Sequence, residues 1–163
     1  ATKGEDRILI KSPKVPTYDL KPEMSAPQIA SRLVKEIKSK KYDFVVVNLV
    51  NGDMVGHTGK ISIIAKAIEA VDKAQGEIVA AALTSGYSCL ILADHGNAED
   101  KSAGVATSHT INPVPVLLIS EDVKLKKAKI EKGAGLKDVA PSILKVMGLK
   151  QPKEMDGKCF LKY

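Results

Sequence analysis

The stretch FVVVNLVNGDMVGHTG, residues 44–59, decides the fold class. Its first seven residues are apolar apart from Asn48, are rich in β-branched side chains and show no strict alternation. This composition is typical of a strand that is buried on both faces of a parallel sheet. Asp53 and His57 follow in the next loop, so chemistry-bearing groups are expected at the carboxyl end of the strand, where open α/β sheets bind their ligands.

The rest of the chain alternates short apolar runs with longer segments of helical periodicity. Ser25 and Gln28 fit a capping box at the start of the first helical segment. We expect strands at 7–10, 44–50, 88–93 and 114–119. We expect one helix that begins after Ser25 and ends around 38–41, and further helices at about 60–83 and at 138–147. The alternation predicts an α/β fold with a mainly parallel sheet, helices on both faces and right-handed crossovers.

All three histidines lie in loops next to predicted strands, and each has an aspartate or a Ser/Thr-rich loop beside it. A lone histidine or a single Asp-His pair in a loop is usually a solvated or capping side chain. Three such loops that together hold every histidine favour a common site instead. If the strands are neighbours, one edge of the sheet brings together Asp53, His57, Asp94, His95 and His109.

Carboxylates held close together repel unless their pKa values shift or a cation binds between them. Two Asp and three His without Cys form a mixed oxygen and nitrogen ligand set, which suits Mn²⁺, Zn²⁺, Co²⁺ or Fe²⁺. Five ligands exceed one tetrahedral site. We therefore expect two ions about 4 Å apart or somewhat more, an arrangement that stabilises both oxygens of a phosphoryl displacement.

Composition argues against several other functions. The 163 residues are 44% apolar and 27% charged, as in a single globular domain, and no apolar run approaches the length that spans a bilayer. The net charge of +6 arises in the Lys-rich residues 123–163, and two Phe, four Tyr and no Trp leave few aromatic rings for stacking bases. We expect neither nucleic-acid nor membrane partners. Cys89 and Cys159 are expected as reduced thiols, and no secretory signal is visible, which predicts a cytoplasmic protein.

Several motifs together resemble one enzyme family. They are SPKV (12–15), TYDLKPEMSA (17–26), DMVGHTG (53–59), ADHGNAE (93–99), His109-Thr110 and NPVP (112–115), and the likeness continues through 151–158. In combination they closely resemble the C-terminal part of the cofactor-independent phosphoglycerate mutases. The resemblance implies the metal-binding, phosphatase-like domain of the alkaline phosphatase superfamily. By that resemblance, residues 1–163 form one such domain, incomplete, as the C-terminal segment of a larger enzyme.

The resemblance also implies a reaction and a ligand set. The family interconverts 3-phosphoglycerate and 2-phosphoglycerate through a phosphoserine intermediate at two divalent ions, with no 2,3-bisphosphoglycerate cofactor. The ligands of one ion match Asp53, His57 and His109, and those of the other match Asp94 and His95. Mn²⁺ is the first expectation, with Co²⁺, Zn²⁺ or Mg²⁺ as alternatives. Phosphoglycerate is implied as the substrate of the complete enzyme.

The chain departs from the family in what it lacks. It has no Asn-Ser-Glu-Val-Gly-His motif with the nucleophilic serine, no opening-strand Asp and no transferase domain. It contains only two arginines, Arg7 and Arg32, whereas a site that binds phosphate and carboxylate groups usually has several. This small number agrees with the absence of the substrate-binding region. We expect no catalytic residue, one fairly complete metal site, one half-built site and no turnover by the chain alone. Replacement nucleophiles exist by residue type only: Ser85, Ser88, Ser102 and Ser108.

Two alternatives stay open. In the first, the chain is a non-catalytic metal-binding or scaffolding half of a split enzyme, and the sheet edge left exposed favours a dimer. In the second, it belongs to another hydrolase or mutase of the same superfamily, such as a phosphatase or a phosphopentomutase. Residues 21–25 and 112–115 favour phosphoglycerate mutase over the second alternative by family likeness.

Overall fold

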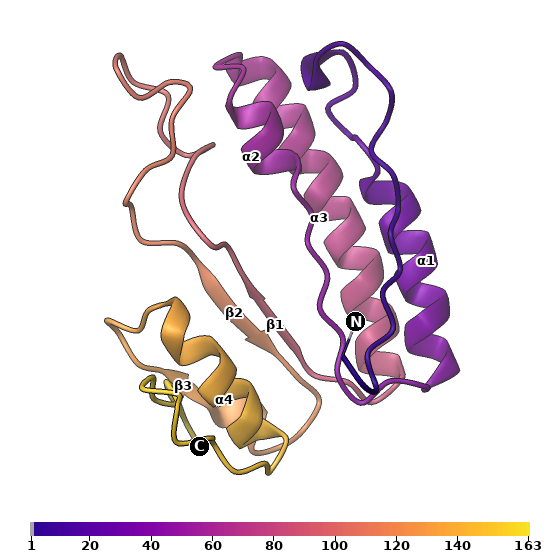
Figure 1. Ribbon diagram of the computed structural model, residues 1–163, viewed down its shortest axis with the longest axis vertical. Coiled ribbons are helices and arrows are strands. Elements are labelled where there is room, and N and C mark those ends of the chain that lie inside the picture. The colour runs from indigo at the N-terminus through magenta and orange to yellow at the C-terminus, as the bar shows by residue number, and fades with distance from the viewer. Residues whose placement is uncertain (1) are drawn as a thin grey trace. The chain divides into compact units, whose positions relative to one another are not determined.

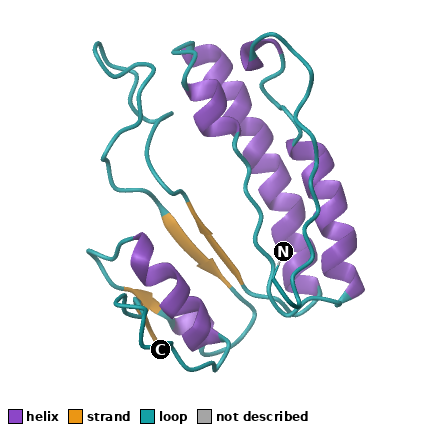
Figure 2. Ribbon diagram, in the orientation of Figure 1, coloured by secondary structure: helices purple, strands orange, loops and turns teal. Residues whose placement is uncertain are grey.

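The computed structural model describes residues 2–163, which divide between Leu117 and Leu118 into two compact units. The elements of the first unit are α1 (Ala26–Ser39), α2 (Asn51–Gly56), α3 (Ile61–Thr84) and β1 (Cys89–Leu92). β2 (Val116–Ile119) contains the division, and the second unit holds β3 (Lys129–Ile130), α4 (Val139–Val146) and β4 (Leu161–Lys162). Figure 1 labels these elements, and Figure 2 shows the long loops that connect them. Across residues 2–163, no helix combines the length and the apolarity that crossing a membrane requires.

α1 and α3 pack side by side in the first unit (Figure 1). The buried cluster between them consists of Ala26, Ala30, Leu33 and Ile37 of α1 and Ala74, Ile78, Ala81 and Ala82 of α3. The alanines at this contact allow the two helix backbones to approach closely. The buried positions recur at helical spacing, so the periodicity-based predictions of these two helices are confirmed.

The N-terminus of α1 differs from the predicted capping box. The Ser25 hydroxyl donates a hydrogen bond to the carbonyl oxygen of Lys11 at 2.8 Å and makes no cap hydrogen bond to the helix. Pro27 lies in the first turn, as expected. The capping-box prediction is wrong because a carbonyl of the preceding segment, distant in sequence, takes the hydroxyl that would otherwise cap the helix.

Two of the predicted strands are absent. Residues 7–10 and 44–50 are outside any strand, and Leu9 is 86% and Val46 78% exposed. Both segments line a groove of about 970 Å³ together with one side of α1. The prediction of a strand buried on both faces is wrong here, because residues 2–163 supply neither the neighbouring strands nor the second covering layer that such a strand needs.

Two small sheets stand in place of the predicted mainly parallel sheet. β1 pairs with β2, and β3 pairs antiparallel with β4, with Ile130 opposite Leu161. β1 and β2 lie within the predicted strands 88–93 and 114–119, so these two strands are confirmed. No parallel sheet occurs within residues 2–163. An apolar run identifies a strand, but the strand's partners and direction depend on the rest of the sheet.

In the second unit, α4 confirms the helix predicted at 138–147. Ser142 is fully buried on α4, where its hydroxyl donates to the Asp138 carbonyl at 2.7 Å and accepts the backbone N–H of Phe160 at 3.0 Å. The Asp138 carboxylate accepts the backbone N–H groups of Gly135 and Lys158 at 2.8 and 2.7 Å. These bonds fix α4 to the segment that leads into β4.

Candidate metal centre

Asp53 and His57 are placed by the short helix α2, which occupies the position predicted as a loop. Asp53 is in its first turn and His57 is its C-cap, so the two side chains share one face at a spacing of four residues. The Asp53 Oδ1 to His57 Nε2 distance is 3.2 Å. α2 itself is held by Asn51, whose buried amide donates to the Pro22 carbonyl at 2.9 Å, and by Val55 in a small apolar cluster.

His109 completes a triangle with these two residues. Its Nε2 lies 3.0 Å from Asp53 Oδ1 and 3.1 Å from His57 Nε2. His57 and His109 have their ring centroids 5.0 Å apart at an interplanar angle of 47°. Three atoms that can each donate a lone pair to a metal therefore lie within 3.2 Å of one another.

This triangle fits a divalent cation. Ligands about 2.1 Å from a metal are separated by roughly 3.0 Å in octahedral and 3.4 Å in tetrahedral geometry. The Nδ1 of His57 is 2.8 Å from the carbonyl oxygen of Thr107, which can only accept, so Nδ1 carries the proton. In the neutral ring Nε2 then has a free lone pair directed at the triangle, as in metal-ligating histidines.

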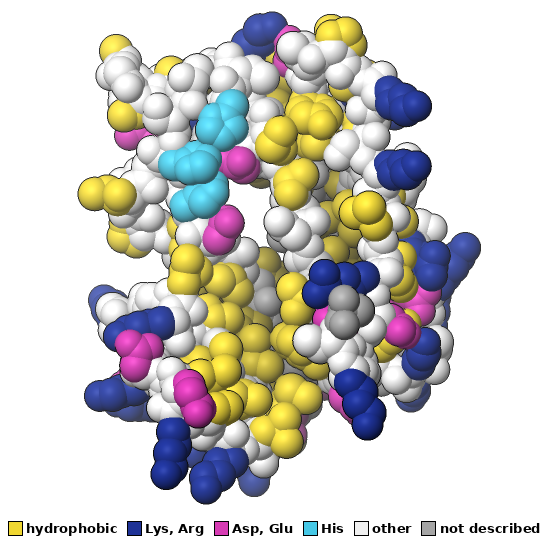
Figure 3. Space-filling view, viewed as in Figure 1, with side chains coloured by type: hydrophobic (Ala, Val, Ile, Leu, Met, Phe, Trp, Pro, Cys, Tyr) yellow, Lys and Arg dark blue, Asp and Glu magenta, His cyan; other side chains and the backbone are white. Residues whose placement is uncertain are grey.

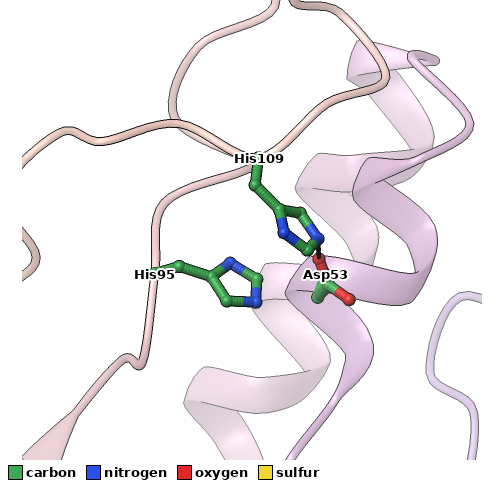
Figure 4. A group of neighbouring side chains, drawn as sticks. All are labelled: Asp53, His95 and His109. Carbon is green, nitrogen blue, oxygen red and sulfur yellow. Dashed lines mark ion pairs between the residues drawn. The ribbon is translucent and has the colours of Figure 1, made fainter.

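His95 joins the group from the loop after β1. Its ring stacks on that of His109, with centroids 3.9 Å apart and planes at 20°. Ligand atoms of Asp53, His95 and His109 all lie within 4.8 Å of one another, as the side chains in Figure 4 illustrate. The three histidines gather on one face of the molecule beside acidic groups (Figure 3).

Asp94 lies at the margin of this group. Its side chain is 76% exposed, and its Oδ2 is 3.8 Å from His95 Nε2. The structure thus brings four of the five predicted residues into one group, in which His95 contacts His109, and Asp94 adjoins the group through His95. All five belong to the first compact unit.

Asn97 is a buried polar residue beside the centre, and its sequence position predicts no role for it. Its Nδ2 donates to Asp53 Oδ1 at 2.7 Å, and its Oδ1 accepts from Lys101 Nζ at 2.6 Å. Gly56 faces this amide, and a Cβ at Gly56 would overlap it. Asn97 is part of the ADHGNAE motif. Sequence spacing alone, however, does not distinguish a metal ligand from a residue that hydrogen-bonds to a ligand.

The surroundings of Asp53 lower the pKa of its carboxyl. Partial burial tends to raise the pKa of its carboxyl, but the Asn97 hydrogen bond and the neighbouring histidine rings outweigh burial and hold the pKa below its ordinary value. Asp53 is therefore ionised at neutral pH and available as an oxygen ligand. Both cysteines are free thiols and neither belongs to the centre.

Curated proteins of one name are similar to this chain in sequence. A 2,3-bisphosphoglycerate-independent phosphoglycerate mutase of Parabacteroides distasonis is 51% identical over 162 residues, which cover 98% of this chain and 31% of that protein. A protein of the same name from Pseudomonas aeruginosa is 51% identical over 95% of this chain and 30% of its own length. The chain thus spans less than one third of the length of the curated relatives it matches.

A solved structure and a family model agree with these relatives. A structure of Leishmania mexicana phosphoglycerate mutase, described as crystallised at low cobalt concentration, matches 94% of this chain and 31% of its own with a TM-score of 0.81 at 27% identity. This match supports the alkaline-phosphatase-like fold that the motifs implied. The family model of the Metalloenzyme superfamily matches residues 1–151. The resemblance predicted from the motifs is confirmed, and the chain belongs to the Metalloenzyme superfamily.

Proposed function

We propose that this chain is part of a 2,3-bisphosphoglycerate-independent phosphoglycerate mutase and forms a single metal-binding, phosphatase-like domain of it. The observation that carries the proposal is the triangle of Asp53, His57 and His109, with sides of 3.0–3.2 Å. The relatives named as phosphoglycerate mutases, which match 95–98% of the chain, support it. The interconversion of 3-phosphoglycerate and 2-phosphoglycerate through a phosphoserine belongs to the whole enzyme.

In this proposal Asp53, His57 and His109 hold one divalent ion, and Asp94 with His95 contributes to a second. Such ions lower the pKa of a serine hydroxyl and neutralise charge on the phosphoryl oxygens. Mn²⁺ is the proposed metal, with Co²⁺, Zn²⁺ or Mg²⁺ as alternatives, because Asp and His accept several of these ions. The Thr107 carbonyl keeps the His57 proton on Nδ1, and Asn97 orients the Asp53 carboxylate.

The nucleophile is proposed to lie outside this chain. In the described residues, the hydroxyls of Ser85, Ser102 and Ser108 form no hydrogen bond with Asp53 or with any histidine of the centre. The chain alone is therefore expected to bind metal without turning over phosphoglycerate. The proposed cytoplasmic location, like the phosphoglycerate substrate, belongs to the whole enzyme.

The test is titration calorimetry of the chain with MnCl₂, combined with a coupled assay for 2-phosphoglycerate. We expect saturable Mn²⁺ binding to the unchanged chain, loss of binding in His109→Ala, and no mutase turnover in either. Absence of Mn²⁺, Co²⁺ and Zn²⁺ binding would contradict the metal-binding proposal. Turnover by the chain alone would contradict the placement of the nucleophile elsewhere.

A second candidate function is a scaffolding half of a split enzyme. The exposed apolar segment 44–50 and the groove of about 970 Å³ that it lines favour this alternative, because an unpaired extended segment is a template for another strand. A second copy of the chain is the simplest partner and would give a dimer. Sedimentation velocity distinguishes the outcomes: a concentration-dependent dimer supports self-pairing, and a monomer at all concentrations contradicts it.

A phosphatase or phosphopentomutase of the same superfamily would use a similar metal centre. The named relatives favour phosphoglycerate mutase over both. Assays with p-nitrophenyl phosphate and ribose 1-phosphate, run beside the phosphoglycerate assay on the whole protein, separate the three activities.

A further inference from the structure

One carboxylate connects the two loops that carry His95 and His109. Glu99 Oε2 accepts the backbone N–H of Asn97 at 2.6 Å, and Glu99 Oε1 accepts from the Thr110 hydroxyl and from the Asn112 amide, the latter at 3.0 Å. Asn97 follows His95 by two residues, and Thr110 directly follows His109. Glu99 therefore fixes the backbone beside each histidine without contacting either ring.

The backbone of the two loops is joined at the same place. The Thr110 N–H donates to the Gly96 carbonyl at 2.8 Å, in an isolated antiparallel bridge. A Cβ at Gly96 would overlap both Glu99 Oε1 and Thr110 Oγ1. Glycine leaves the space that the carboxylate and the hydroxyl occupy. We call the group Gly96, Asn97, Glu99, Thr110 and Asn112 the loop clamp.

Asn97 extends the loop clamp to Asp53. Glu99 holds its backbone N–H, while its side-chain Nδ2 donates to Asp53 Oδ1 at 2.7 Å. The Asn97 side chain is closely confined, since the residue is 4% exposed and Lys101 donates to its Oδ1 at 2.6 Å. Glu99 thus acts, through intermediate residues, on three of the proposed ligands.

The chemistry of the loop clamp requires an ionised carboxylate. The Thr110 hydroxyl, opposed by desolvation and aided by the amide donors, lowers the pKa of Glu99 to about 2. The three groups that hydrogen-bond to Glu99 all donate to it, so both carboxylate oxygens accept. A glutamine at this position would place an N–H against one of these donors and lose at least one bond.

We infer that Glu99 is a positioning residue of the proposed metal centre, whose carboxylate holds residues 95–97 against residues 109–112 so that His95, His109 and Asp53 face common ions. This inference rests on the proposed function and extends it to a residue that is not a ligand. Hydrogen-bond partners behind the ligands typically change metal affinity by about 10–100-fold when they are removed.

The test uses the 163-residue chain with Mn²⁺ as the probe in titration calorimetry. Glu99→Gln is expected to weaken Mn²⁺ binding by about 10–100-fold. Glu154→Gln removes the same charge from an exposed residue outside the centre and is expected to bind as the unchanged chain does. If the unchanged chain binds no metal, the proposed function fails together with this inference. If it binds Mn²⁺ and Glu99→Gln binds equally well, only this inference is overturned.

A second variant tests whether Glu99 acts through Thr110. Thr110→Val removes the hydroxyl donor alone and is expected to weaken binding about fivefold, the equivalent of one net hydrogen bond. It also keeps the test possible if Glu99→Gln does not fold. Because both variants break one unit, the double variant should bind little more weakly than Glu99→Gln alone, whereas fully additive losses would overturn the loop clamp.

The visible spectrum of bound Co²⁺ reports the arrangement of the ligands separately from the stability of the chain. The visible absorption of Co²⁺ depends on the number and arrangement of its ligands. At saturating Co²⁺, Glu99→Gln should have an altered spectrum, while Glu154→Gln should reproduce the spectrum of the unchanged chain. An unaltered Glu99→Gln spectrum would mean that the ligands are positioned without the carboxylate, and would overturn the inference.

Discussion

The Nδ1–H of His57 donates to the carbonyl oxygen of Thr107 at 2.8 Å, which joins the end of α2 to the loop that carries His109. The bond selects the tautomer of the ring and directs Nε2 towards Asp53 and His109. One backbone carbonyl thus links the tautomer of one proposed ligand to the placement of another.

Asp53→Asn should abolish tight metal binding. The amide keeps the size of the side chain but removes the anionic oxygen that lies 3.0 Å from His109 Nε2 and 3.2 Å from His57 Nε2. We expect Mn²⁺ affinity to fall by more than about 100-fold. This loss is larger than the one that follows removal of a ligand's hydrogen-bond partner, because here a ligand itself is removed. The measurement is titration calorimetry, with the exposed α3 variant Asp72→Asn as the control. Equal affinity in Asp53→Asn would remove Asp53 from the ligand set.

Gly56→Ala should destabilise the chain, because the added Cβ overlaps the Asn97 side chain. Overpacking of this kind costs about 1–3 kcal/mol. The matched control is Gly76→Ala on α3, where nothing lies within 4 Å of the new Cβ. There alanine should stabilise the helix by roughly 0.5–1 kcal/mol. Urea unfolding measures both, and a destabilising Gly76→Ala or a neutral Gly56→Ala would contradict the prediction.

Protonation of Glu99 at low pH should remove the contribution of the loop clamp to the stability of the chain. Folding lowers the pKa of Glu99 from 4.5 to about 2, so its contribution to stability is fully present above about pH 4.5 and is lost as the pH falls towards 2. The unchanged chain should therefore lose stability more steeply than Glu99→Gln between about pH 4.5 and about pH 2. Urea midpoints at several pH values test this, and parallel curves for the two proteins would contradict it.

Val46→Lys should prevent self-association through the exposed segment 44–50. The side chain of Val46 is 78% exposed, so a lysine there costs little in the monomer. A charge on an edge segment opposes pairing with another strand. Sedimentation velocity should show a smaller dimer fraction than in the unchanged chain. Val123→Lys, which alters an exposed valine in the second unit, should leave the dimer fraction unchanged.

The periodicity of the apolar residues correctly predicted α1 and α3, which pack against each other. The buried face of α1, including Leu33 and Ile37, meets α3 as its spacing indicated. Residues 44–50 carry an equally clear pattern, yet Val46 is exposed and no strand forms there. A helix satisfies its backbone hydrogen bonds within itself, whereas a strand depends on neighbours, so only the helix prediction is independent of the rest of the fold.

The candidate site was predictable to the extent that residue type identifies a metal ligand. Asp53, His57, His95 and His109 do come together, although Asp53 and His57 lie on α2 and not at the end of the strand predicted at 44–50. Glu99 was not predicted, because its role depends on which donors surround it in space. Thr110 and Asn112 are more than ten residues away in sequence, and no spacing rule connects them to a glutamate in a turn.

The His57 and His109 side chains are separated by 52 residues, including all of α3. An ion shared between them would close that stretch into a ring and act as a reversible staple. A ligand that binds only the native state raises the free energy of unfolding by about 2.7 kcal/mol when the free ligand concentration is 100 times its dissociation constant. Resistance to heat and to proteolytic nicking would then vary with the supply of manganese, and chelation would release the staple without altering a covalent bond.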